Sequence, residues 1–172
     1  AEQGATVYLT ARTIKAGGHA LPGLIEETVA EIGHRAAQSG GKAIGVALDL
    51  HDDDAIAALF GRVRREQGRL DILVNNAMAI PHSMTEQKGF WQKPIADELE
   101  ILDTGVRAAF IAAHHAANIM APQGSGLIVG MSGYVGRTYT YDVMFGTAKT
   151  ATDRMARDMG VELKPHGVAS VS

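Results

Sequence analysis

Gly126-Leu-Ile-Val-Gly-Met-Ser132 is the stretch that decides the fold class. It is a short apolar run bounded by turn residues, too short for a helix, and it predicts a strand over residues 126–131. Comparable runs predict strands over residues 5–10, 43–48, 70–75 and 168–171. Strands that alternate with helical patterns favour parallel pairing through right-handed crossovers. We therefore expect an α/β fold, a doubly wound parallel sheet with helices on both faces.

Helical patterns lie between these runs. Residues 56–63 place one apolar stripe after Asp52 and Asp53, which we expect to cap that helix. Residues 99–120 carry a longer pattern that should end before Pro122, because proline follows many helix ends. The remaining patterns predict a helix over residues 148–163 and, after a loop rich in turn formers at residues 13–23, a helix that starts near Pro22.

Composition narrows the class of protein. The 172 residues, 46% hydrophobic and 20% charged, suit one compact domain with a substantial core. The net charge of -3 is spread along the chain, so we expect no nucleic acid or membrane as a partner. No apolar stretch approaches the ~18 residues of a membrane span, and the first residues do not resemble a signal peptide. The absence of cysteine excludes disulfides and fits a cytoplasmic protein, which is the location we expect.

The histidines do not suggest a metal site. Only His114 and His115 are adjacent among the seven, and neighbours on a helix point in different directions. We expect no bound metal.

Polar residues follow three of the predicted strands. Asn75-Asn76-Ala77 closes the run at residues 70–75, Arg12 follows the run at residues 5–10, and Asp49 follows that at residues 43–48. Open α/β sheets bind ligands at the carboxyl ends of their strands, where buried amides also need hydrogen-bond partners. These residues are binding candidates, although Arg12 also suits a solvated surface charge and Asp49 a helix N-terminal acid.

Ser132, Phe145 and Lys149 carry a resemblance to a known family. Together with Asn75-Asn76-Ala77, their spacing resembles the Ser and Tyr-x-x-x-Lys pattern of the short-chain dehydrogenase/reductase family, with Phe145 in place of the tyrosine. The resemblance implies a Rossmann-like fold and hydride transfer between a nicotinamide cofactor and a small-molecule carbonyl or alcohol. In that family the serine polarises the carbonyl, the tyrosine protonates the developing alkoxide, and the lysine lowers the pKa of the tyrosine.

Phe145 cannot donate a proton, and loss of a positioned acid typically costs a factor of ~10² to 10⁴ in rate. Tyr141 and Tyr139 precede it by four and six residues. We expect them to pack or line the pocket instead of replacing the acid, because four residues of helix rise by about 6 Å. Asp103 stands where many relatives have an asparagine that orders a water beside the lysine. Two roles are open: it accepts the same water and pairs with Lys149, or it is a buried helix residue satisfied locally.

The same resemblance implies a cofactor site. Arg12, with Ala11 where NAD-preferring relatives carry an acid, favours the 2′-phosphate of NADP over NAD. Asp49 and Leu50 are expected at the adenine, and Asn75, Asn76, Ala77 and Lys149 along the cofactor.

The family's first strand and its glycine-rich phosphate loop are not found in this chain, and it stops where relatives continue into substrate-binding loops. We therefore expect residues 1–172 to form a single incomplete Rossmann-like domain. Three solutions are open for the missing central strand: an incomplete sequence, a strand donated by another chain, or direct closure between residues 5–10 and 70–75.

Within the family, the chain resembles the subgroup typified by dehydrogenase/reductase member 1. The similar stretches are residues 21–28, 60–77, 90–91, 105–107 and 162–168. Three hypotheses remain: an NADP-dependent oxidoreductase with another proton donor, a catalytically impaired relative that binds nucleotide or serves as an oligomeric structural module, and a fragment that exists mainly as an oligomer. Family oligomers often pair through the helices expected around residues 99–120 and 148–163, so a homo-oligomer is expected.

Overall fold

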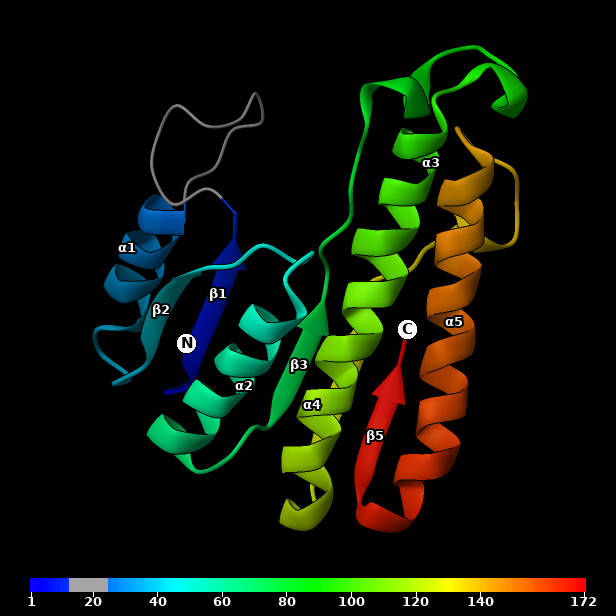
Figure 1. The fold of residues 1–172 in the computed structure, drawn as a ribbon. Coiled ribbons are helices and arrows are strands. Elements are labelled where there is room, and N and C mark those ends of the chain that lie inside the picture. The colour runs from blue at the N-terminus through cyan, green and yellow to red at the C-terminus, as the bar shows by residue number, and fades with distance from the viewer. Residues whose placement is uncertain (13–24) are drawn as a thin grey trace. The chain divides into compact units, whose positions relative to one another are not determined.

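The computed structural model describes residues 1–12 and 25–172 as alternating strands and helices (Figure 1). The strands are β1 Thr6–Ala11, β2 Lys42–Ala47, β3 Ile72–Asn75, β4 Gly126–Gly130 and β5 Val168–Val171. The α-helices are α1 Ile25–Ala36, α2 Asp53–Gln67, α3 Ile95–Leu102, α4 Ala108–Gln123 and α5 Val143–Leu163. The predicted α/β class is confirmed, and each strand end lies within two residues of its expected place. The loop at residues 13–23 and the helix start near Pro22 fall outside the described residues.

All strand pairs are parallel, but they form two sheets: β1–β2, and β3–β4–β5 with β4 in the centre. Direct closure between residues 5–10 and 70–75 is not found among the described strand pairs. The chain divides into two compact units, Ala1–Ala55 and Ile56–Ser172. That residues 1–172 form one domain stays a prediction.

In the first unit, α1 packs closely on the β1–β2 pair. The acidic first turn and basic last turn of α1 complement its helix dipole, and Ile25 and Ala36 are buried. A Cβ atom added at Gly45 would lie 2.8 Å from Cγ2 of Ile25, so the close approach of helix and strand requires glycine there.

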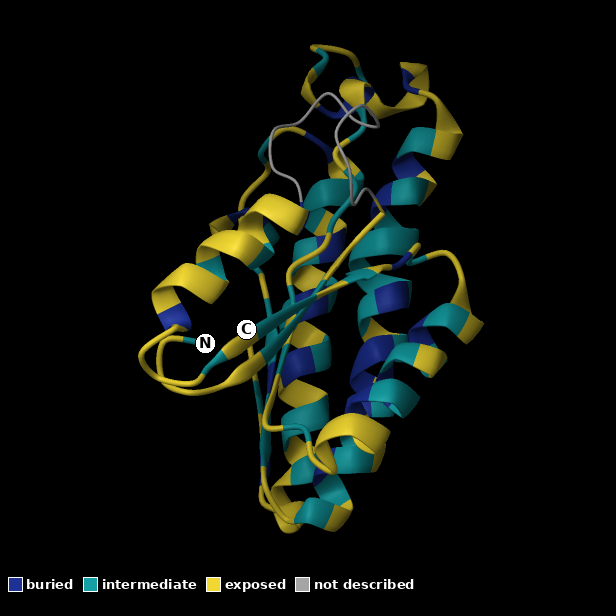
Figure 2. Ribbon diagram, turned by 90° about the vertical axis from the view of Figure 1, so that its left-hand side faces the viewer, coloured by how far each residue is buried: buried dark blue, intermediate teal, exposed yellow. Residues whose placement is uncertain are grey.

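In the second unit, α4 and α5 pack against β3–β4–β5. Ile128 of the central strand is 1% exposed, and Met120 of α4 and Ala156 of α5 are buried with it. Figure 2 shows buried and intermediate residues concentrated along these two long helices. Helices were expected on both faces of the sheet, yet Ile72 and Val74 are 57% and 53% exposed. Successive strand residues point to opposite faces, so the face of β3 away from α4 remains open to solvent.

The long helix expected over residues 99–120 contains an irregular turn. Between α3 and α4, Asp103–Arg107 form a π-helical turn, a feature that frequently marks functional sites. Helix α4 does not end before Pro122 as expected but includes it, and stops at Gly124, whose φ of 75° is favourable only for glycine.

Helix α5 begins earlier than expected because Asp142 caps it. Its carboxylate accepts hydrogen bonds from the backbone N–H groups of Met144, at 2.7 Å, and Phe145, at 3.4 Å. The helix therefore starts at Val143, and Lys149 lies in its second turn instead of opening it.

Within residues 1–12 and 25–172, no helix combines the length and the apolar character needed to cross a membrane.

Candidate active site

Ser132 and Lys149 meet at the carboxyl end of β4. Ser132 follows the strand by two residues, and its hydroxyl donates to the backbone oxygen of Lys149 at 3.2 Å. The ammonium of Lys149 donates to the backbone oxygen of Met131 at 2.7 Å. The strand end and the second turn of α5 are thus joined by two hydrogen bonds, as the sequence spacing suggested.

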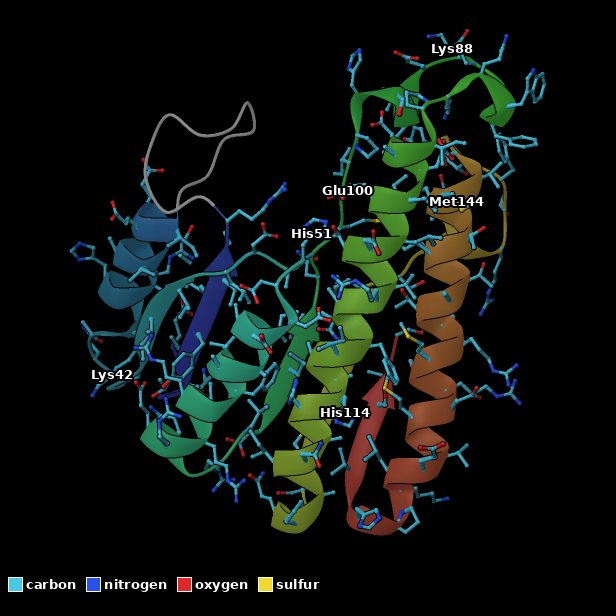
Figure 3. All side chains as sticks on the ribbon, in the orientation of Figure 1. Lys42, His51, Lys88, Glu100, His114 and Met144 are labelled. Carbon is cyan, nitrogen blue, oxygen red and sulfur yellow. The ribbon has the colours of Figure 1, made fainter. Side chains whose placement is uncertain are left out.

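The ring of Phe145 lies beside this lysine. The Lys149 ammonium is 5.8 Å from the centre of the ring, which is within the range of a cation–π contact. The ring also packs against a buried cluster formed by Met84, Ile101 and Ala148. Figure 3 labels Met144, the neighbouring residue, near the N-terminal end of α5. The position that carries the acid in the family is therefore occupied by an apolar side chain in contact with the cation.

Lys149 itself is partly buried. Burial lowers the pKa of its ammonium, and the charge of Asp153 opposes that shift only in part. A partly desolvated cation at this point favours negative charge that develops nearby.

A narrow pocket lies beside Lys149, with about 20 Å³ of interior space, which is room for about one water molecule. Its polar lining comes from Asn75, Lys149 and Thr152, and most other lining residues are small or are methionines. This pocket is mostly apolar with a few polar groups, and it adjoins the end of β4, the edge at which open α/β sheets bind ligands.

Asn75 connects β3 to α4. Its side-chain amide donates to the backbone oxygen of Ala109 at 3.0 Å, so at least part of its role is structural. Asn76 and Ala77 are exposed beyond the end of the strand. Their backbone and side chains are free to face a ligand at this edge of the sheet.

Asp103 does not make the expected pair with Lys149. It lies in the π-helical turn, and its carboxylate is 3.5 Å from the guanidinium of Arg107, one turn further on. An acidic and a basic residue four positions apart on a helix lie on the same face and commonly pair. The sequence spacing therefore already indicated Arg107 as a competing partner for Asp103.

The expected adenosine residues lie in the first unit. Arg12 and Asp49 follow β1 and β2, which are neighbouring parallel strands, and Arg12 is exposed. Oδ1 of Asp49 accepts the backbone N–H of His51 at 3.0 Å and lies 2.8 Å from its ring Nδ1. These two hydrogen bonds lower the pKa of Asp49, and the bond from the backbone of His51 has the larger effect. Leu50 is half-buried beside it.

A buried ionic cluster at the start of α5 was missed by sequence reasoning. The side chains of Lys93 and Asp142 are 2% and 1% exposed and form an ion pair. Burial alone would raise the pKa of Asp142, but the hydrogen bonds from Lys93 and from the two backbone amides outweigh it and lower that pKa. Only the helix-capping position of Asp142 offered a signal in the sequence.

Glu98 completes this cluster from α3. It is 8% exposed, and its Oε1 has no hydrogen-bond partner among the described residues. The pKa of Glu98 is raised, mainly because the side chain is buried and also because the negative charge of Asp142 lies nearby.

Within the described ranges, no group of three or more metal-ligating side chains is close enough to hold a metal ion.

Parallel strands with polar residues at their carboxyl ends define a Rossmann-type α/β fold, in which ligands bind at that edge of the sheet. Known proteins of this fold are similar to the chain in sequence. A family model described as enoyl-(acyl carrier protein) reductase matches residues 1–170. The "Dehydrogenase/reductase SDR family member 1" proteins of Homo sapiens and Mus musculus are 36% identical over 98% of this chain and 51% of theirs.

Solved structures share the fold. A metagenomic short-chain oxidoreductase in complex with NADP has a TM-score of 0.79 at 24% identity, over 97% of this chain and 69% of that one. An NAD⁺-bound xylitol dehydrogenase also has a TM-score of 0.79, at 20% identity, over 98% and 59%. This chain belongs to the short-chain dehydrogenase/reductase family. It spans about half the length of the curated relatives named above.

Proposed function

We propose that this protein transfers hydride between NADP(H) and the carbonyl or alcohol group of a small molecule. The observation that carries the proposal is the meeting of Ser132, Lys149 and the Phe145 ring at the end of β4. The bound cofactor would supply the hydride. The Ser132 hydroxyl polarises the substrate carbonyl by donating a hydrogen bond, and the Lys149 ammonium stabilises the oxygen as it becomes negative.

The cofactor would be held at the carboxyl ends of the strands. Arg12 offers a guanidinium for a 2′-phosphate, and Asp49 with Leu50 would face the adenine. Asn76 and Ala77 would line its path with Asn75, and Asp103 would order a water near Lys149. The exposed positions of Arg12, Asn76 and Ala77 support these roles.

Phe145 makes the reaction slow in this proposal, because no acid stands at that position. The chemistry that remains is polarisation and charge stabilisation, which still accelerate a reaction when an acid is lost.

The test is NADPH oxidation by the purified full chain with a panel of aldehydes and ketones, together with direct measurement of NADPH binding. We expect slow turnover that falls about 10-fold or more in Ser132→Ala and in Lys149→Met, since each removes one stabilising group. Ser125→Ala, a serine in the turn before β4, is the matched control. NADPH binding without turnover would favour the alternative of an impaired, nucleotide-binding relative.

The proposal extends to the setting of the protein. The cysteine-free composition supports a reducing compartment such as the cytoplasm. Exposed apolar side chains on the long helices, Phe110 of α4 and Val161 of α5, support self-association.

A further inference from the structure

Tyr141 has an unusual backbone conformation. Its φ is 66°, in the left-handed region that bulky residues rarely adopt, and no other non-glycine residue in the described ranges has a positive φ. The backbone N–H of Asp142 donates to the oxygen of Thr140 at 2.8 Å, so Tyr141 is the central residue of a tight three-residue turn. Such a conformation costs about 1–3 kcal/mol and persists only where the surroundings enforce it.

The residue after Tyr141 enforces the turn. Asp142 is buried, caps α5 and is held by the equally buried Lys93. The turn is therefore fixed on its C-terminal side, while Tyr141 itself remains 58% exposed.

The turn also directs the tyrosine ring toward Phe145. The two ring centres are 6.1 Å apart in an edge-on arrangement, and the same Phe145 ring lies 5.8 Å from the Lys149 ammonium. A helical turn was expected to separate Tyr141 from Phe145. Instead, α5 begins only at Val143, and Tyr141 lies in the turn before it with its ring against that of Phe145.

We propose that Tyr141 donates the proton that Phe145 cannot. This assignment rests on the proposed function and names its missing acid. The carbonyl carbon accepts hydride with its electron pair, and the π electrons of the C=O bond move to the oxygen. The O–H bond of Tyr141 breaks as its proton bonds to that oxygen, and water then reprotonates the phenolate. The strained turn is the cost of presenting this phenol.

The test compares Tyr141→Phe with Tyr139→Phe, an exposed tyrosine two residues away in the same loop. NADPH oxidation with the carbonyl panel should fall at least 10-fold in Tyr141→Phe, with NADPH affinity unchanged, and should be unaltered in Tyr139→Phe. Adding Phe145→Tyr to Tyr141→Phe should restore the rate, because the second phenol offers the proton from the position that relatives use. If Tyr141 had a purely structural role, Phe145→Tyr would raise the rate by the same factor in the parent protein and in Tyr141→Phe, and equal factors would overturn the assignment.

A second readout does not depend on activity. Asparagine tolerates positive φ better than tyrosine does, so Tyr141→Asn should leave the urea unfolding midpoint unchanged or raise it. A clear fall in the midpoint would show that Tyr141 is there for packing and would overturn the assignment. Equal rates for Tyr141→Phe and the parent protein would also overturn it, as would NADPH binding without any turnover. Failure to bind NADPH at all would instead overturn the proposed function, and the assignment with it.

Discussion

Single side chains set the cofactor preference in this account. Arg12 follows β1 directly and is exposed, so its guanidinium is available to a ligand at that end of the strand. Arginine offers a planar fork of donors that matches a phosphate, whereas an NAD-specific site offers an acid to the ribose hydroxyls.

Replacement of Arg12 by alanine should weaken the binding of NADPH and leave the binding of NADH unchanged. Hydrogen bonds to charged groups contribute about 1.5–3 kcal/mol, which corresponds to a roughly 10- to 100-fold higher dissociation constant. Fluorescence titration with each cofactor measures this, and Arg35→Ala, an exposed arginine on α1, is the control. Equal weakening of both cofactors would show that Arg12 does not read the 2′-phosphate.

The partners of single residues were predictable from the sequence only where they lie close along the chain or on adjoining elements. The spacing of Ser132 and Lys149 along the chain is matched by a hydrogen bond between the serine hydroxyl and the lysine backbone, while their catalytic roles stay a prediction. Asp103 was expected near Lys149 but pairs with Arg107, since spacing along a helix also brings in a local competitor. Tyr141 packs against Phe145, as expected for an aromatic residue of this loop. Its positive-φ turn was not predictable, because the turn precedes Asp142, whose partner Lys93 lies 49 residues away along the chain.

At the scale of elements, the start of α5 depends on the buried cluster of Lys93, Asp142 and Glu98. If Glu98 ionises, two carboxylates share Lys93 as the one buried cation of the cluster among the described residues, and Asp97 and Tyr139 lie nearby on the adjoining segments. A carboxyl group whose pKa is raised on folding binds more protons in the folded state than in the unfolded one.

The free energy of unfolding should therefore fall as pH rises from the ordinary glutamate pKa through the raised pKa of Glu98. The slope for one proton is at most about 1.4 kcal/mol per pH unit. Glu98→Gln should remove this fall, so its advantage over the parent protein should grow with pH in that window. Asp142 acts in the opposite sense, because its pKa is lowered and its stabilisation is lost as pH falls below the ordinary aspartate range.

Urea unfolding at a series of pH values measures this contribution. Glu100→Gln, on the same helix and labelled in Figure 3, is the control and should keep the slope of the parent protein. Identical pH profiles for Glu98→Gln and the parent would mean that Glu98 ionises normally.

The elements themselves were largely predictable. Short apolar runs bounded by turn residues located every strand, because burial in a parallel sheet requires such runs. The π-helical turn and the inclusion of Pro122 in α4 were not, because both depend on packing around the helix and not on its own periodicity.

At the scale of the whole molecule, the open apolar surfaces favour association of copies. Phe110 and Val161 are 54% and 70% exposed on α4 and α5. Light scattering should give a mass above the 18.2 kDa of one chain. Phe110→Glu should shift that mass toward one chain, because a buried unpaired charge in an interface is unfavourable. Glu100→Gln should not. A parent protein that is monomeric at high micromolar concentration would contradict the expectation.

The central claim is that a family active site is assembled around Ser132 and Lys149, with an apolar ring at position 145. Phe145→Tyr tests it most directly, with the rate of NADPH oxidation on the carbonyl panel as the readout and NADPH affinity as the control. We predict at least a 10-fold higher rate with unchanged affinity, because a phenol beside the lysine offers the proton from the position that relatives use. An unchanged or lower rate in a variant that still folds and binds NADPH would contradict the account.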